Sequence, residues 1–138
     1  MNARRTTVPS EAAQLPVLTR FLQEFWSAAD LPPAEALPFE LALEEIFMNV
    51  VMHGSPAGSV PRVDVSLALA DGGLTLTVED DGPPFDPLSL PAPDTTAGLE
   101  ERKVGGFGVF FVRQMMDAVS YQRVGARNQL TMAKQLAR

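Results

Sequence analysis

Two stretches of alternating apolar and polar residues constrain the fold of this chain most strongly. The apolar positions are Val63, Val65, Leu67 and Leu69 in the first stretch and Leu74, Leu76 and Val78 in the second. Such alternation is typical of strands with one buried and one exposed face. Asp71, Gly72 and Gly73 separate the stretches and predict a tight hairpin. The chain therefore needs helices to cover one face of an antiparallel sheet.

Two long segments have the spacing expected of those helices. In residues 11–29 apolar side chains recur every three or four positions; Ser10 is a plausible N-cap and Pro16 suits a first turn. Residues 39–53 contain neither Gly nor Pro, and Gly54 is expected to end this helix in a left-handed conformation. Both segments are long enough to lie across a sheet.

Further strands are expected near both ends of the chain. Residues 4–8 form a candidate first strand, and residues 118–124 and 129–136 form a candidate hairpin that turns at Gly125 and Asn128. Another helix is expected to follow the glycine-rich segment that precedes this hairpin. This order predicts an α+β fold: a two-layer sandwich with a mixed, mostly antiparallel sheet and helices on one face.

Length and composition limit the possible functions. The 138 residues are the size of one domain, so residues 1–138 are expected to form a single domain, with a proline-bearing lid at about 86–104. The formal charge of −6 argues against binding nucleic acid or an anionic membrane. The absence of cysteine and the single histidine exclude thiolate and histidine-rich metal sites. No apolar run is long enough to span a bilayer, which favours a cytoplasmic protein.

Three polar features require a common explanation. Glu45 and Asn49 lie one helical turn apart, Asp80 and Gly82 follow a strand, and residues 105–108 (Gly-Gly-Phe-Gly) open a helix. Glycines before a helix let the backbone approach phosphate oxygens. An Asp can accept a hydrogen bond from the amino group of adenine, an Asn oxygen can ligate magnesium, and a Glu can deprotonate a hydroxyl. Together these features predict a site for a magnesium nucleotide.

Individually, several residues also have ordinary structural explanations. Glu44 is expected to face solvent, and His53 suits the C-terminal end of a helix. Asp81 suits a turn, and Phe110 and Phe111 are expected in the core. Glycines are also common at the ends of strands and helices that bind no ligand. The nucleotide hypothesis therefore depends on the three features occurring together.

Three motifs, in this order, resemble those of the GHKL ATPases. Residues 45–49 (Glu-Ile-Phe-Met-Asn), followed by His-Gly at 53–54, resemble the N-box. Residues 80–87 (Asp-Asp-Gly-Pro-Pro-Phe-Asp-Pro) resemble the first glycine box, and residues 105–109 (Gly-Gly-Phe-Gly-Val) resemble the second. The chain is most similar to the stand-alone anti-sigma regulatory factors, which are serine/threonine kinases of bacterial partner-switching systems.

The resemblance implies the Bergerat ATP-binding fold, with ATP and Mg²⁺ as cofactors. Within it, Glu45 would be the catalytic base, Asn49 would hold magnesium and Asp80 would bind the adenine amino group. The positions implied to bind the cofactor are Asn49, His53, Asp80, Gly82, Gly106, Phe107 and Gly108. A sigma factor and a STAS-type anti-sigma antagonist are the implied partners, and a homodimer is possible.

One departure from the family pattern leaves a second function open. Pro84 stands where the first glycine box usually has a second glycine, and proline excludes positive φ. The adenine pocket is therefore expected to be reshaped. The alternative is a nucleotide-gated protein-binding module without significant kinase activity. Arg102 and Lys103 in the lid are equally consistent with phosphate contacts and with solvated charges.

Overall fold

The computed structural model describes residues 2–54, 60–89 and 106–136, with side chains in the last segment from residue 108 onward. Its strands are β1 (Asn2–Pro9), β2 (Arg62–Ala70), β3 (Gly73–Asp80), β4 (Ala118–Val124) and β5 (Arg127–Gln135). Its α-helices are α1 (Leu15–Ala28), α2 (Ala36–His53) and α3 (Gly106–Met115). Short 3₁₀ turns, η1 (Ala12–Gln14), η2 (Pro33–Glu35) and η3 (Pro87–Ser89), occupy some of the connections.

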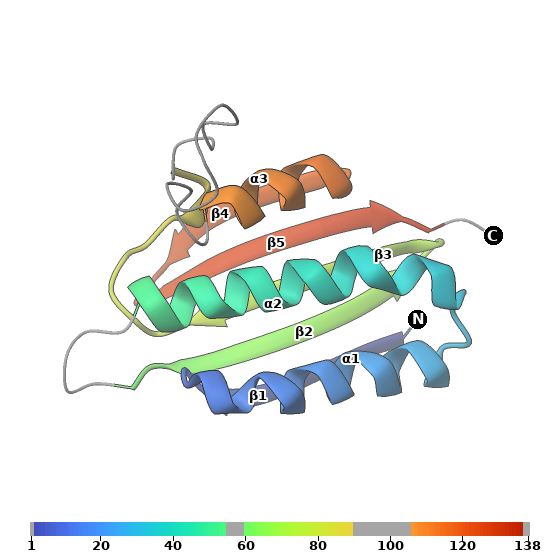
Figure 1. The fold of residues 1–138 in the computed structure, drawn as a ribbon, viewed down its shortest axis with the longest axis horizontal. Helices are drawn as coiled ribbons and strands as arrows, with labels where there is room; N and C mark the ends of the chain where they lie inside the picture. The colour runs from blue at the N-terminus through green and yellow to red at the C-terminus, as the bar shows by residue number, and fades with distance from the viewer. Residues whose placement is uncertain (1, 55–59, 90–105, 137–138) are drawn as a thin grey trace.

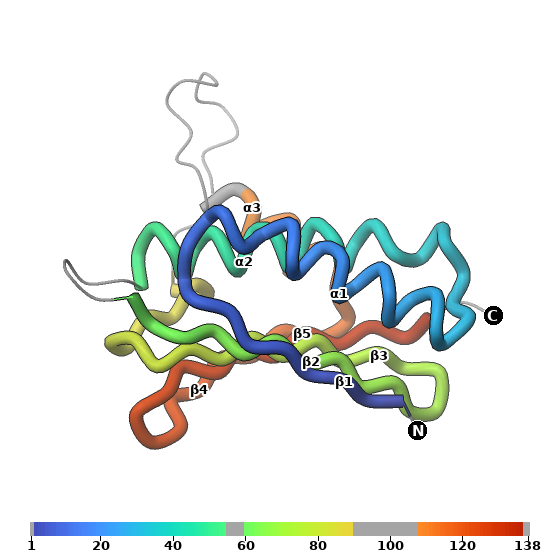
Figure 2. Tube along the Cα trace, turned by 90° about the horizontal axis from the view of Figure 1, so that it is seen from below, coloured from blue at the N-terminus to red at the C-terminus, as the bar shows by residue number. Residues whose placement is uncertain are grey.

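The strands form one sheet in the order β1-β2-β3-β5-β4 (Figure 1). Each described pair of neighbours is antiparallel. The helices lie together on one side of this sheet, and its other side carries no helix among the described residues (Figure 2). The predicted α+β two-layer sandwich is confirmed, with a sheet that is antiparallel at every described pairing.

The core lies between the two layers and follows the alternation of the strands. Val63, Val65 and Leu67 of β2 and Leu74, Leu76 and Val78 of β3 are almost fully buried. They meet the helix side chains Leu18, Leu22, Phe25 and Trp26 of α1 and Phe39, Leu43, Ile46 and Phe47 of α2. The rings of Trp26 and Phe39, whose centroids are 5.7 Å apart, join α1 to α2. Each such buried side chain stabilises the fold by about 1.5–3 kcal/mol.

The β2–β3 hairpin is turned by Asp71 and Gly72, with φ of 53° and 79°. Positive φ at both central residues is the mark of a type I′ turn, whose twist matches that of the strands. Gly73 pairs with Ala70 and is the first residue of β3. The hairpin prediction is confirmed.

Two predicted helix ends differ from the structure. Gly54 has φ −97°, so the helix does not end in a left-handed residue; its N–H donates to the carbonyl oxygen of Val50 at 2.8 Å. The N-cap of α1 is Gln14, not Ser10, because η1 comes between Ser10 and the helix. Ser10 instead donates its backbone N–H to the oxygen of Pro61, 2.9 Å away.

Helix α3 also corrects an expectation about its aromatic residues. Its buried side is formed by Val109 and Val112, continued by Met116 just beyond the helix. Phe111 lies off this side and is 45% exposed, so the core position expected for it is wrong. Among the residues that the structure describes, no helix has the length and apolarity needed to cross a membrane.

The face of the sheet without helices carries an ionic cluster. Asp64 is only 6% exposed and accepts hydrogen bonds from Thr7, Arg5 and Arg127. The two arginine nitrogens lie 2.5 and 2.6 Å from its Oδ2. Burial raises the pKa of Asp64, but these three hydrogen bonds outweigh that effect and lower it to about 2. The cluster links β1, β2 and β5, and β5 is not a neighbour of β2 in the sheet.

Candidate functional site

Asn49 and Glu45 form a polar pair in the middle of α2. The side-chain nitrogen Nδ2 of Asn49 donates to the backbone oxygen of Glu45 and to its Oε2, both at 2.8 Å. Because both acceptors are oxygens, the amide must direct its own oxygen Oδ1 away from Glu45. That Oδ1 is buried and has no hydrogen-bond partner among the residues that the structure describes. Asn49 is 1% exposed, so its unpaired oxygen lowers the stability of the fold unless a ligand binds to it.

The carboxyl group of Glu45 lies against the beginning of α3. A Cβ atom added at Gly108 would lie 2.0 Å from Cδ of Glu45, so glycine is needed here while Glu45 keeps this position. Burial raises the pKa of Glu45 and the charge of Glu44 adds to this, whereas the hydrogen bond from Asn49 lowers it. The structure thus brings together the N-box pair and the second glycine segment. Glu44 is exposed, as expected.

Asp80 ends β3 on the helix-covered side of the sheet and is 4% exposed. Its Oδ1 accepts from the backbone N–H of Gly82 at 2.9 Å and from Nδ2 of Asn128 at 3.0 Å. Burial raises the pKa of Asp80, and the hydrogen bonds from Asn128 and Gly82 partly offset this. The carboxyl group is thus held in place at the strand end where adenine recognition was predicted.

The first glycine segment packs against the C-terminal end of α2. A Cβ at Gly82 would lie 2.4 Å from the carbonyl oxygen of Gly54, so only glycine permits this backbone approach. The ring of His53, the last residue of α2, lies against that of Phe85, with centroids 5.6 Å apart and planes tilted by 32°. Asp81 is exposed, and its carboxyl group accepts from the backbone N–H of Arg62, the first residue of β2, at 2.7 Å.

Asn128 is the site residue that sequence analysis missed. It is not a turn residue: the β4–β5 turn is Gly125 and Ala126, and Asn128 pairs with Asp80 across the sheet. Its Nδ2 also donates to the oxygen of Pro83 at 2.9 Å, and its Oδ1 accepts from the N–H of Phe85 at 3.1 Å. These bonds hold the loop on both sides of Pro84. A sequence signal for this role was present. The strand was predicted to begin at residue 129, and starting it one residue earlier places Asn128 on the same face as Leu130 and Met132.

Among the described residues, two separate cavities adjoin residues of the predicted site. Asp80 and Asn128 line a cavity of about 10 Å³ beneath Ile46 and Val50 of α2, which is room for about one water. Glu45 and Gly108 line a separate groove of about 470 Å³ between α2 and α3.

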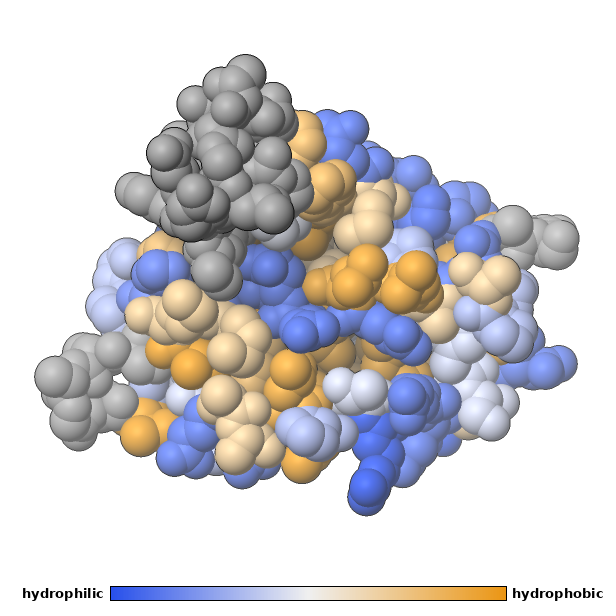
Figure 3. Space-filling view, in the orientation of Figure 1, coloured by the Kyte–Doolittle hydropathy of each residue, from blue (hydrophilic) through white to orange (hydrophobic). Residues whose placement is uncertain are grey.

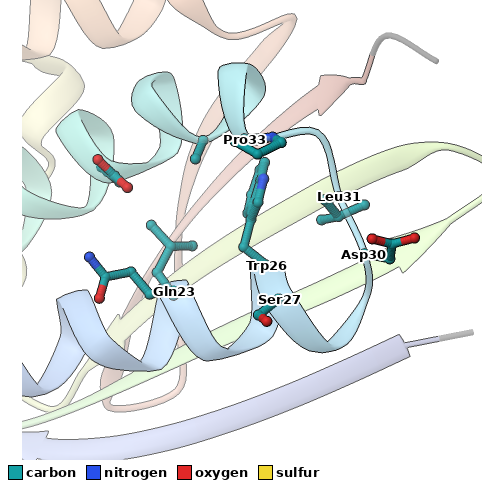
Figure 4. A pocket seen from close by; sticks show the side chains of 9 residues that line it. Gln23, Trp26, Ser27, Asp30, Leu31 and Pro33 are labelled. Carbon is teal, nitrogen blue, oxygen red and sulfur yellow. The ribbon is translucent and has the colours of Figure 1, made fainter.

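Another cavity of about 440 Å³ lies between the end of α1 and the start of α2 (Figure 4). Trp26, Leu31 and Pro33 line it, with Asp30 at one end (Figure 4). None of the predicted nucleotide-site residues contributes to its lining. It is separate from the candidate site.

Some predicted residues lie outside what the structure describes. Gly106 and Phe107 belong to α3 by their backbone, but the side chain of Phe107 is not among the described ones. Most of the predicted lid at 86–104, including Arg102 and Lys103, also lies outside the described residues. The roles assigned to these positions stay predictions.

Comparison with known proteins decides the family. Residues 8–134 match the histidine kinase-like ATPase domain. The chain belongs to this family. It is 30% identical over 118 residues to the serine/threonine-protein kinase BtrW of Bordetella bronchiseptica, a match that covers 84% of this chain and 78% of BtrW. The resemblance to the GHKL ATPases is confirmed.

Two solved structures share the fold of this ATPase-family chain. The structure of the RsbU and RsbW domains of Rv1364c from Mycobacterium tuberculosis has a TM-score of 0.72 at 16% identity. That match covers 100% of this chain and 33% of the other. The histidine kinase AdeS of Acinetobacter baumannii has a TM-score of 0.53 at 15% identity, covering 98% of this chain and 70% of that one.

The described residues of this ATPase domain can hold magnesium only if a nucleotide and water supply most of the ligands. They contain no group of three His, Cys, Asp or Glu side chains that could hold a metal by themselves. Asn49 offers a buried oxygen without a partner, beside the carboxyl group of Glu45. Magnesium in nucleotide sites commonly takes one or two protein ligands, with phosphate oxygens and waters as the others. The donor set therefore fits an ion that arrives with a nucleotide.

Proposed function

We propose that this protein is an ATP-dependent serine/threonine protein kinase of the anti-sigma-factor type. It binds ATP with magnesium, phosphorylates an antagonist protein and, in its other state, sequesters a sigma factor. The observation that carries the proposal is the buried Asn49, which donates two hydrogen bonds to Glu45 and whose oxygen has no partner in the described part of the chain. The similarity to the kinase BtrW supports the choice of a protein hydroxyl as the acceptor.

The reaction assigns one task to each part of the site. Glu45 accepts the proton of the attacking Ser or Thr hydroxyl while the new O–P bond forms and the bond to the β-phosphate oxygen breaks, releasing ADP. Burial raises the pKa of Glu45, which makes it a stronger base than an exposed carboxylate. Asn49 would hold magnesium, which when bound neutralises charge on the phosphates. Most of the rate enhancement comes from positioning and charge stabilisation.

Asp80 determines which nucleotide, ATP or GTP, is preferred in this proposal. Its carboxylate accepts a hydrogen bond from the amino group of adenine, which guanine replaces with a carbonyl at the corresponding position. Asn128 and Gly82 fix Asp80 through Oδ1. A fixed acceptor loses less entropy on binding than a mobile one.

The test uses the full chain, γ-labelled ATP and a purified STAS-type antagonist from the same organism. The wild type should label the antagonist, and Glu45→Gln should lose labelling while calorimetry shows unchanged ATP affinity. Glu24→Gln is the matched control, because Glu24 is an exposed carboxylate on α1 that lines neither cavity of the candidate site, and it should behave as the wild type. ATP binding by the wild type without any transfer to the antagonist would refute the kinase proposal.

A second function has a specific observation in its favour. The described residues leave a cavity of about 10 Å³ at Asp80, beside the loop that carries Pro84, and a nucleotide that widened this cavity would move Ile46 and Val50 of α2. A nucleotide-gated binding module would use that rearrangement to change its affinity for a partner without chemistry. In that case Glu45→Gln would leave partner regulation by ATP and ADP intact.

A further inference from the structure

The cavity between the end of α1 and the start of α2 has both apolar walls and carboxylates. Trp26, Leu31 and Pro33 contribute to the walls, and Asp30 and Glu40 are acidic residues of its lining. Its volume of about 440 Å³ is within the range of small-molecule sites. Figure 3 views the helix layer and shows hydrophobic and hydrophilic residues side by side over α1 and α2. The cavity is therefore suited to a ligand that is itself partly apolar and partly charged.

Trp26 provides a fixed aromatic wall for this cavity. Its indole nitrogen donates to the carbonyl oxygen of Pro32 at 2.8 Å, and its ring packs against that of Phe39. Figure 4 shows Trp26 between Gln23 and Asp30 along the cavity. A hydrocarbon chain that lies against such a wall is removed from water, and an aromatic ring also attracts cations. Because the ring is already held in place, a ligand does not have to order it.

The end of the cavity at Asp30 is negative for two reasons. The backbone N–H of Asp30 donates to the oxygen of Ser27, and that of Leu31 donates to the oxygen of Trp26, both at 3.1 Å. These bonds form a Schellman motif, in which Asp30 takes the left-handed position with φ 54°. Glycine is favoured there, and a carboxylate is unfavourable beside the partial negative charge of a helix C-terminus. A bound cation would offset both negative charges.

The second carboxylate lies farther along the cavity. Residues 29–35 join α1 to α2, so Asp30 lies at the connection, whereas Glu40 lies within α2. Glu40 comes four positions after Ala36, which is about 6 Å along the helix axis. On α1, Gln23 and Asp30 are seven positions apart, or about 10 Å at the helical rise. The cavity is therefore elongated, with its two acidic residues at different positions along it.

We propose that this cavity binds a linear aliphatic polyamine. The hydrocarbon chain lies along Trp26 and Leu31, and the terminal ammonium groups meet Asp30 and Glu40. An extended chain covers at most about 3.6 Å with three bonds, so a span of about 10 Å takes about eight or nine bonds, as between the terminal nitrogens of spermidine. The formal charge of −6 on the chain also favours the approach of a polycation.

The test titrates the full chain, without nucleotide, with spermidine, with the monoamine butylamine and with the long-chain dicarboxylate suberate. Trp26 is the single tryptophan, so its fluorescence reports on the cavity directly, and calorimetry gives the stoichiometry. We expect saturable one-to-one binding of spermidine, at least tenfold tighter than that of butylamine, and no binding of suberate. Added salt should weaken spermidine binding, because it screens the carboxylates.

Asp30→Asn and Glu40→Gln should each weaken spermidine binding at least fivefold. Both variants are expected to fold, because asparagine tolerates positive φ and glutamine has the shape of glutamate. Urea unfolding without ligand checks this. Glu24→Gln is the matched control, because it removes an exposed carboxylate of α1 that does not line the cavity, and it should bind as the wild type does.

Three results would overturn the polyamine site. They are no saturable response to spermidine, binding of butylamine or suberate as tight as that of spermidine, and an equal loss of affinity in Glu24→Gln and Glu40→Gln.

The inference goes beyond the proposed kinase function, because no residue of the candidate nucleotide site lines this cavity. Spermidine binding by a protein that does not bind ATP would support the polyamine site and count against the kinase alone. Kinase activity in a protein that does not bind spermidine would do the reverse.

Discussion

Replacing Asn128 with Ala tests whether one buried amide holds the candidate adenine-binding end of the site. The amide makes five hydrogen bonds, to Asp80, Pro83, Phe85, Tyr121 and Arg123. The bond to the Asp80 carboxyl group is worth about 1.5–3 kcal/mol because its acceptor is ionisable and buried. The other partners are at least partly exposed, so water replaces Asn128 and they add only about 1 kcal/mol together. We expect a loss of about 3 kcal/mol in the free energy of unfolding.

The loss should depend on pH in a defined direction. Burial already raises the pKa of Asp80 above the ordinary value of an aspartate, and the hydrogen bond from Asn128 limits that rise. Without Asn128 the folded-state pKa rises further, so ionised Asp80 destabilises the folded state more. The stability deficit of Asn128→Ala should therefore grow as the pH rises through the folded-state pKa of Asp80. It should shrink at lower pH, where Asp80 is protonated in both states.

Urea unfolding, followed by the fluorescence of the single tryptophan, Trp26, gives the free energy directly. With a slope of about 2 kcal/mol per M, a loss of 3 kcal/mol moves the midpoint by about 1.5 M. Gln129→Ala is the matched control, since it removes only an exposed hydrogen bond to Gln122 on the other face of the sheet. Its expected cost is below about 0.5 kcal/mol. Equal midpoints for the two variants, or a deficit that does not change with pH, would show that the hydrogen bond from Asn128 to Asp80 does not stabilise the fold as expected.

Three further substitutions have distinct expected outcomes. Asp64→Asn should lower the free energy of unfolding by about 1–2 kcal/mol at pH 7, because the pKa of Asp64 in the folded state is lowered to about 2. Urea unfolding should show that this difference disappears as the pH falls from about 4 to 2. Gly82→Ala forces the Gly54 backbone away and should cost about 1–3 kcal/mol, so an unchanged thermal midpoint would contradict the contact. Gly108→Ala should change stability by less than about 1 kcal/mol, because helix propensity offsets the displacement of Glu45. Phosphate transfer should nevertheless fall at least tenfold, and unchanged transfer would argue against Glu45 as the base.

The fold was largely predictable because local patterns were unambiguous. The alternation in residues 63–69 and 74–78 fixed which side of each strand is buried, and that requirement placed the helices. Gly54 was assigned the wrong backbone conformation because a helix can also end with a residue at negative φ, as it does here at −97°. Phe111 was expected in the core from its residue type alone. Its position on α3, off the stripe of buried valines, determines its exposure.

The candidate site was only partly predictable because its contacts join distant segments. Glu45 and Asn49 are neighbours on one helix, so their pairing followed from their spacing. The contact of Asn128 with Asp80 spans 48 positions and depends on strand register, which a single sequence does not define. The close approach of Gly108 to Glu45 likewise depends on how α3 packs against α2. These long-range contacts determine the geometry that the motifs only suggest.

Isothermal titration calorimetry with ATP and magnesium on the wild type and on Asp80→Asn shows whether Asp80 binds the adenine of ATP. We expect saturable one-to-one ATP binding by the wild type, weaker binding of GTP, and at least a tenfold loss of ATP affinity in Asp80→Asn. Urea unfolding of the same variant, without nucleotide, shows whether it is folded. Equal ATP affinity of the wild type and a folded Asp80→Asn, or no ATP binding by the wild type, would contradict the assignment of this site to ATP.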